Sequence, residues 1–210
     1  MRSLPLRVTV VAGFVALSVL LEAHSNERDA ADRMQIVVSV FNRAGAPVQA
    51  VLGAETIAAK IYERGGVIIV WRNCSTVAQP DLERCGAANQ PGEIVLNIEH
   101  QALTRTADTY GVAFLGQDGR GKFCDVFYDR ILTLHHSGRV SEGTILGIVA
   151  AHELGHLLLG PDSHSATGIM RPQIQCHDLL VPEFGVNHFT SQQLQKIRMR
   201  QKQVVVNEGR

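Results

Sequence analysis

Two histidines and a glutamate interrupt the most apolar helix expected in the chain, in the run His152-Glu153-Leu154-Gly155-His156. In an α-helix, residues four apart are separated by about 40° of rotation and about 6 Å of rise. The two imidazoles would therefore lie on one face, one turn apart, where they can bind a single tetrahedral ion. Glu153 would be rotated by about 100° from His152, close enough to reach a water molecule on the metal but poorly placed to bind the metal itself. The H-E-x-x-H pattern of zinc sites encodes this division of roles.

The residues around the motif predict a helix that is buried at the centre of the domain. Residues 144–159 are apolar nearly all round, which is typical of a helix without a solvent-exposed face. Ser141 is the expected N-cap, and Gly160-Pro161 is the expected end. Burying two imidazoles and a carboxylate without partners costs several kcal/mol. Because metal coordination removes most of that cost, we interpret the motif as a metal site.

A catalytic zinc site needs a third protein ligand and one open position. At this point the sequence resembles the metzincin clan of zinc metallopeptidases. Their pattern is H-E-x-x-H-x-x-G-x-x-H, followed by a methionine-containing turn beneath the metal. The likeness to the matrix-metalloprotease form includes His-Glu-Leu-Gly-His and Met170, which follows His152 by 170 − 152 = 18 positions.

The loop after the helix is longer than the clan's pattern. Leu159 stands where the clan has its glycine, and Gly160 follows one residue later. Asp162 stands where the clan has its third ligand, and His164 follows two residues later. Either His164 binds the metal through a rearranged loop, or Asp162 does, as in clan members that use aspartate. We favour His164 because imidazole is the commoner zinc ligand, but loop length alone does not decide between them.

The resemblance implies a cofactor, a base and a substrate strand. Zinc would lower the pKa of a bound water, and Glu153 would accept its proton during attack on a peptide carbonyl and deliver it to the departing nitrogen. Met170 would be a buried floor beneath the histidines, although Arg171-Pro172 follow it where metzincins often have a tyrosine. The clan also implies an edge strand that pairs antiparallel with extended peptide substrate, with an ordinary interior strand as the alternative. The candidate is Gly111, Val112, Ala113, Phe114 and Leu115.

Apolar and β-branched runs predict five strands, at 35–41, 67–71, 94–98, 110–115 and 123–128. A helix at 56–64 follows the first strand, so the chain opens with a strand-helix-strand unit that predicts a partly parallel sheet. Thr190 and Gln193 form a capping box before a C-terminal helix from 191 to about 202. We therefore expect an α+β domain with a mixed, mostly parallel twisted sheet, a crossover helix and a buried active-site helix, followed by the methionine turn and the C-terminal helix.

The N-terminus has the features of a secretory signal peptide. Arg2 and Arg7 precede a mostly apolar run at 8–21, which is shorter than the about 20 residues of a membrane span. Small residues follow at Ala23 and Ser25. We expect a signal peptide at 1–25 and a single metallopeptidase-like catalytic domain at 26–210, secreted or periplasmic and without a stable membrane anchor.

Export favours disulfides between the four cysteines. Cys74 and Cys85 flank a polar loop, so Cys74–Cys85 is the preferred pair, and Cys124–Cys176 is then the second. Four cysteines allow three pairings, and a zinc site made of cysteines has no C-x-x-C spacing to support it.

Charge and composition exclude other classes of protein. The 210 residues contain 20 Lys+Arg and 20 Asp+Glu and are 5% aromatic, which argues against a nucleic-acid binder. The leading hypothesis is a secreted, monomeric zinc endopeptidase whose partner is a peptide or protein substrate. The alternatives are an exported, zinc-stabilised binding protein without catalysis and a zinc amidase acting on a non-protein amide. Glu153 argues against the binding protein because a structural zinc site needs no base.

Overall fold

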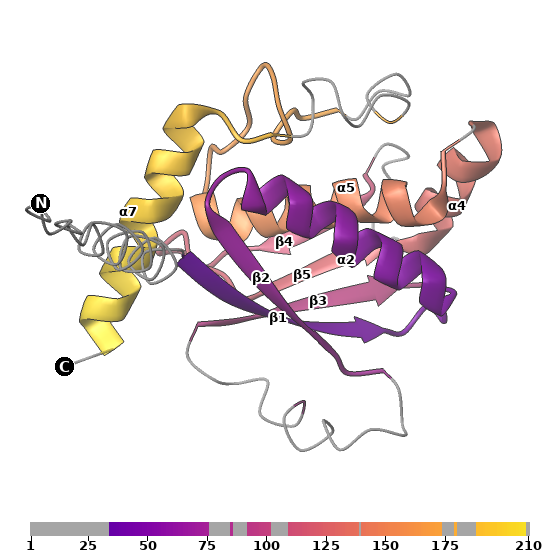
Figure 1. Ribbon diagram of the computed structural model, residues 1–210, viewed down its shortest axis with the longest axis horizontal. Helices are drawn as coiled ribbons and strands as arrows, with labels where there is room; N and C mark the ends of the chain where they lie inside the picture. Colours follow the sequence, from indigo (N-terminus) through magenta and orange to yellow (C-terminus); the bar gives the residue numbers. More distant parts are fainter. Residues whose placement is uncertain are drawn as a thin grey trace, which may run out of the picture. The chain divides into compact units, whose positions relative to one another are not determined.

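The computed structural model describes residues 34–75, 85, 92–101, 109–138, 140–173, 179 and 188–208. The expected signal peptide at 1–25 and the cysteine at position 176 lie outside these residues. The described elements form a sheet with helices packed on it (Figure 1).

Five strands form one mixed sheet in the spatial order β2-β1-β3-β5-β4. In sequence order they are β1 (Met34–Asn42), β2 (Val67–Asn73), β3 (Glu93–Glu99), β4 (Gly111–Phe114) and β5 (Phe123–Phe127). β2, β1, β3 and β5 run parallel, whereas β4 is antiparallel to β5 and lies at the edge. The expected α+β class and mostly parallel sheet are confirmed, and the strand at 111–114 lies at the edge of the sheet, not in its interior.

The buried helix predicted from the sequence is α5 (Glu142–Leu159). The Ser141 side chain accepts a hydrogen bond from Thr144 N at 3.2 Å, so the expected N-cap is present. Gly160 ends the helix with a φ of 79°, a backbone conformation that glycine adopts without steric cost. Nearly every residue of α5 is buried, which fits its apolar character.

The crossover helix α2 (Val48–Glu63) lies on the same face of the sheet as α5 (Figure 1). It begins at Val48, whereas the sequence predicts a start at residue 56. Its first half buries small residues, including Ala50 and Ala54, which give little amphipathic signal but let the two helices come close. A Cβ on Gly147 of α5 would lie 2.7 Å from Ala54 O, so the helices touch backbone to backbone.

Two further helices complete the described fold. One of them, α4 (Tyr128–Ser137), is not predicted from the sequence. It follows β5 directly and begins at Tyr128, which was expected to be the last residue of the strand at 123–128. α7 (Ser191–Glu208) has the predicted capping box. Thr190 N donates to Gln193 Oε1 at 2.9 Å, and Gln193 N donates to Thr190 Oγ1 at 3.3 Å. None of the helices in the described parts of the chain combines the length and the apolar character needed to cross a membrane.

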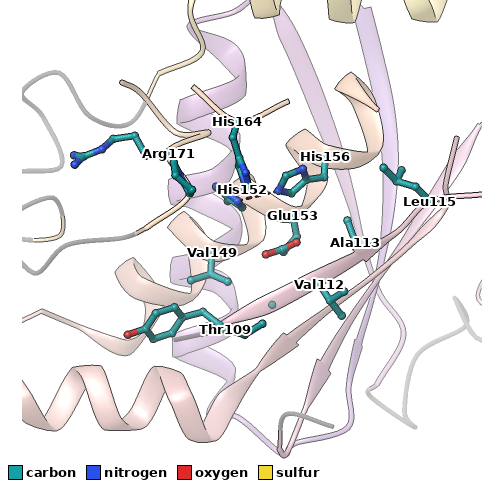
Figure 2. A pocket seen from close by; sticks show the side chains of 13 residues that line it. Thr109, Val112, Ala113, Leu115, Val149, His152, Glu153, His156, His164 and Arg171 are labelled. Carbon is teal, nitrogen blue, oxygen red and sulfur yellow. Dashed lines mark hydrogen bonds between the residues drawn. The ribbon is translucent and has the colours of Figure 1, made fainter. Parts of the chain in front are cut away.

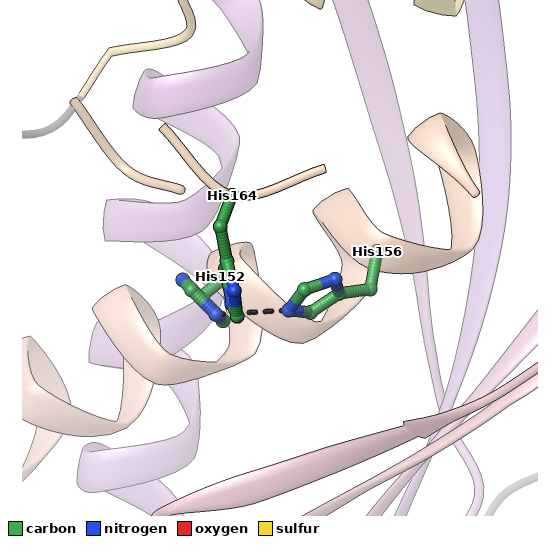
Figure 3. A group of neighbouring side chains, drawn as sticks. All are labelled: His152, His156 and His164. Carbon is green, nitrogen blue, oxygen red and sulfur yellow. Dashed lines mark hydrogen bonds between the residues drawn. The ribbon is translucent and has the colours of Figure 1, made fainter. Parts of the chain in front are cut away.

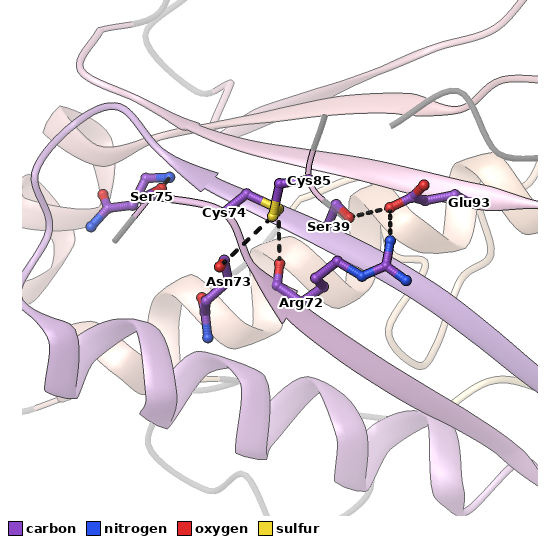
Figure 4. Close-up of a disulfide and its surroundings, with 8 residues drawn as sticks. Ser39, Arg72, Asn73, Cys74, Ser75, Cys85 and Glu93 are labelled. Atoms are coloured by element: carbon purple, nitrogen blue, oxygen red, sulfur yellow. Dashed lines mark hydrogen bonds and ion pairs between the residues drawn. A yellow bond between two sulfur atoms is a disulfide. The ribbon is translucent and has the colours of Figure 1, made fainter. Parts of the chain in front are cut away.

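One of the two predicted disulfides is present. Cys74 and Cys85 are bonded, with their Cα atoms 5.5 Å apart, beside the partly buried ion pair of Arg72 and Glu93 (Figure 4). The predicted Cys124–Cys176 bridge includes position 176, which lies outside the described residues, and Cys124 carries a free thiol. Cys124 lies in β5 with no solvent exposure, and its thiol is directed toward Val95 O of the neighbouring strand.

Candidate metal centre

Three imidazoles converge beside α5. His152 and His156 lie one turn apart on the helix, and their Nε2 atoms are 3.0 Å apart. His164 comes from the loop after the helix, and its ring points toward the other two (Figure 3). One nitrogen from each residue lies within 4.8 Å of the others. Nitrogen atoms at these separations can bind one shared ion with Zn–N bonds of about 2.1 Å. Three histidines are also a donor set that zinc accepts, so these residues fit the metal.

Hydrogen bonds hold the two helix histidines in the orientation that a metal site needs. His152 Nδ1 lies 2.8 Å from the carbonyl oxygen of Ile169, which can only accept, so Nδ1 carries the proton. His156 Nδ1 shares a hydrogen bond of 2.7 Å with Ser163 Oγ. Both rings can thus present an unprotonated Nε2 to a metal, which is the usual role of such outer hydrogen bonds.

Burial sets the charge states of the site. It lowers the pKa of His152, and together with the two neighbouring imidazoles it lowers the pKa of His156 to about 4. Both rings are therefore neutral at pH 7, the form that binds metal. Burial also raises the pKa of Glu153 to about 8, and a cation beside this carboxyl would lower that value.

The structure brings His164, and not Asp162, to the two helix histidines. Asp162 is exposed and has a φ of 54°, so it occupies the left-handed position of the turn that redirects the chain. Asp162 and His164, the two candidates for the third ligand, therefore have different positions in the loop. Asp162 bends the loop, and His164 reaches the centre.

Glu153 points from α5 toward β4 (Figure 2). It is 6% exposed and contacts the strand at Gly111. A Cβ at Gly111 would lie 2.7 Å from Glu153 Cγ and 2.9 Å from Oε1. Gly111 belongs to the candidate substrate strand predicted from the sequence, but no sequence pattern indicates that its missing side chain makes room for the carboxylate.

A cavity of about 320 Å³ opens between β4, α5 and the loop (Figure 2). Gly111, Val112, Ala113 and Leu115 line it, whereas Phe114 does not. Leu115 lies just beyond the end of β4. The remaining lining residues are Thr109, Tyr110, Val149, His152, Glu153, His156, His164, Arg171 and Pro172. The candidate substrate strand, the three histidines and the free carboxylate therefore share one cavity.

Met170 is completely buried and packs against the underside of α5. A Cβ on Gly155 would lie 2.4 Å from Met170 Sδ, so the turn lies directly against the helix. The carbonyl of Met170 accepts a hydrogen bond from Ser165 N at 2.9 Å, which ties the turn to the loop that carries His164.

No protein-family model and no curated protein matches the sequence. Among solved structures, metalloproteinase-II from Bacteroides fragilis matches with a TM-score of 0.50 and 11% identity, over 80% of this chain and 54% of that one. The chain has the fold of a metalloproteinase. It spans about half the length of the Bacteroides protein.

Two further solved structures are similar. The zinc-dependent peptidase from Methanocorpusculum labreanum has a TM-score of 0.49 and 13% identity, over 76% of this chain and 99% of that one. The archaemetzincin from Methanopyrus kandleri has a TM-score of 0.49 and 14% identity, over 81% of this chain and 96% of that one.

Proposed function

We propose that this protein is a zinc-dependent endopeptidase of the metzincin type. One observation carries the proposal: three imidazoles converge in a cavity that also contains a buried carboxylate left out of the ligand set. A structural zinc site is normally closed by four protein ligands, whereas a catalytic site keeps a position open. Three ligands, an adjacent acid and an open cavity together match the catalytic arrangement.

The residues of the chain have distinct tasks in this proposal. His152, His156 and His164 hold the ion, which, when bound, acts as a Lewis acid and makes water nucleophilic at neutral pH. Glu153 takes a proton from the attacking water and returns it to the leaving nitrogen. Its burial against Gly111 keeps the carboxylate on the side of the cavity that faces β4.

The edge strand supplies the proposed peptide-binding surface. β4 pairs with β5 on one side and is the last strand of the described sheet, so its outer backbone groups can pair with an extended chain. Because β4 and Glu153 line the same cavity, a peptide paired with the strand would bring its carbonyl groups to the histidines. This arrangement favours a polypeptide substrate over a small amide.

Hydrolysis of casein by the purified protein tests the proposal. We expect one zinc per chain and casein cleavage that chelator abolishes. Glu153→Gln should keep the zinc but lose about 10²–10⁴-fold in kcat/KM, the usual contribution of an acid–base residue. Glu63→Gln is the matched control, because Glu63 is an exposed residue of α2, and it should retain full activity.

Other outcomes identify the alternatives. Stoichiometric zinc without turnover of casein or of any amide would indicate a zinc-stabilised binding protein. Cleavage of cell-wall fragments but not of casein would indicate a zinc amidase. Protein that binds no transition metal would refute the enzyme proposal altogether.

We also propose that the protein is exported through its first 25 residues and acts as a secreted or periplasmic monomer. The Cys74–Cys85 disulfide supports this proposal, since such bonds persist in oxidising compartments. N-terminal sequencing of protein recovered outside the cytoplasm should start at residue 26. Recovery of the uncut chain from the cytoplasm, with Cys74 and Cys85 reduced, would contradict it.

A further inference from the structure

A single buried side chain connects the C-terminal helix to the loop that carries the third histidine. Gln193 is the third residue of α7 and is 8% exposed. Its Oε1 accepts the hydrogen bond from Thr190 N described above. Its Nε2 donates to Ser163 O at 3.1 Å and to Ser165 Oγ at 3.0 Å. Gln193 therefore contacts the residue on each side of His164.

The partners fix which way the amide of Gln193 points. Thr190 N can only donate, so it requires the amide oxygen, and Ser163 O can only accept, so it requires the amide nitrogen. Rotating the amide by 180° would leave both partners unpaired. Because the site is buried, an unpaired backbone group there would cost stability.

The two serines that Gln193 holds belong to the metal centre. Ser163 is buried, and its Oγ bonds to His156 Nδ1. Ser165 donates its backbone N–H to Met170 O and its hydroxyl to Thr167 O at 2.7 Å. Through Ser163, Gln193 is linked to the hydrogen bond that orients His156. Through Ser165, it is linked to the turn at Met170 beneath the helix.

His164 needs such support more than the other two histidines do. His152 and His156 are fixed by the helix backbone, but His164 is exposed and lies in a segment without regular secondary structure. Ordering a free loop costs backbone entropy, and neighbours that are already held reduce this cost when a metal binds. We propose that Gln193 is a positioning residue for the third ligand, so that α7 forms part of the metal centre. The inference rests on the zinc site of the proposed function.

Helix capping alone does not account for the amide at this position. A capping box accepts Glu as readily as Gln, because only the acceptor oxygen is used. The two hydrogen bonds to Ser163 and Ser165 instead require the donor nitrogen that Glu lacks. Capping and positioning can therefore be separated by substitution.

Three variants of the full-length protein make this separation. Gln193→Glu keeps the cap acceptor and loses the donors, whereas Gln193→Met loses both without adding a charge. Thr190→Val removes the hydroxyl half of the cap and leaves the bonds to the serines in place, so it is the matched control. For each variant, zinc affinity is measured by competition with a chelator, the ligand geometry by the visible spectrum of the Co²⁺ form, and the stability of the metal-free protein by urea unfolding.

We expect both Gln193 variants to bind zinc at least about 10-fold more weakly than the wild type and to alter the Co²⁺ spectrum, as is usual for residues that support metal ligands. Thr190→Val should lower the urea midpoint and keep the wild-type zinc affinity and spectrum. His164→Ala provides the reference for a double-mutant cycle. In the His164→Ala background, Gln193→Met should weaken zinc binding less than it does in the wild type.

The proposal is overturned if both Gln193 variants bind zinc as the wild type does, if Thr190→Val weakens binding equally, or if the effects of Gln193→Met and His164→Ala simply add. These results differ from failure of the proposed function. If the wild type itself binds no zinc, the metal centre is wrong and this inference is lost with it. If the wild type binds zinc, the variants decide the role of Gln193 alone.

Discussion

Replacing Gly111 by alanine should separate the position of the proposed catalytic carboxylate from the binding of the metal. The new Cβ would lie 2.7 Å from Glu153 Cγ, and ordinary van der Waals contact begins at 3.4 Å. Glu153 must therefore retreat by at least 3.4 − 2.7 = 0.7 Å, or β4 must move by a similar distance. The Cβ would also meet Asp125 O of β5 at 2.8 Å, so the strand cannot shift freely toward its neighbour.

A misplacement of about 1 Å costs on the order of 100-fold in rate when the displaced group takes part in the reaction. We therefore expect Gly111→Ala to lose roughly 100-fold in kcat/KM for casein. Zinc content should stay at the wild-type level, because Glu153 is not a ligand in the proposed site. Overpacking should also lower the free energy of unfolding by about 1–3 kcal/mol.

The assay combines casein hydrolysis at saturating zinc, metal analysis and urea unfolding. Gly138→Ala is the matched control, since its Cβ would meet nothing closer than Leu134 O at 3.5 Å, and it should behave as the wild type. Wild-type turnover by a folded, zinc-loaded Gly111→Ala protein would show that Glu153 does not need its place beside β4. The assignment of Glu153 as the base would then lose its structural support.

Three further predictions follow from the structure. His164→Ala should lower zinc affinity by more than 10-fold, whereas Asp162→Asn should leave it unchanged; equal loss in a chelator competition would contradict the ligand assignment. Gly155→Ala should destabilise the protein by about 1–3 kcal/mol in urea unfolding, because its Cβ would press on Met170 Sδ; unchanged stability would contradict this packing. Burial raises the pKa of Glu55 in the fold, so charging it opposes folding. Glu55→Gln should raise the urea midpoint at pH 7. This gain should decrease as the pH falls through the pKa of Glu55 in the folded protein, and it should vanish below about pH 4. A gain that persists in acid would refute the explanation.

The parts of the site that depend on local spacing could be predicted from the sequence. His152 and His156 share a helix face because residues four apart always do, and the apolar run around them indicates a buried helix. The capping box at Thr190 and Gln193 is equally local, since it joins residues three apart. Strands with clear apolar and β-branched runs were also predictable, to within a few residues at their ends.

Other features depend on contacts between distant segments. The loop that brings His164 to the other two histidines is hydrogen-bonded to Gln193, about thirty residues later in the chain. No pattern in the sequence brings Gly111 beside Glu153, because their contact depends on where β4 packs. Cys124 was predicted to be bridged because export favours pairing, but its thiol is free and completely buried in the hydrophobic core.

The close contact between α2 and α5 has a consequence for how metal enters and leaves. Gly147 lies directly against the backbone at Ala54, and the helix itself fixes the spacing of its two histidines. Any opening of the centre therefore falls to the exposed third ligand and its short loop. For the proposed zinc site we therefore expect the metal to exchange in the folded domain, on the timescale of a loop movement and not of global unfolding.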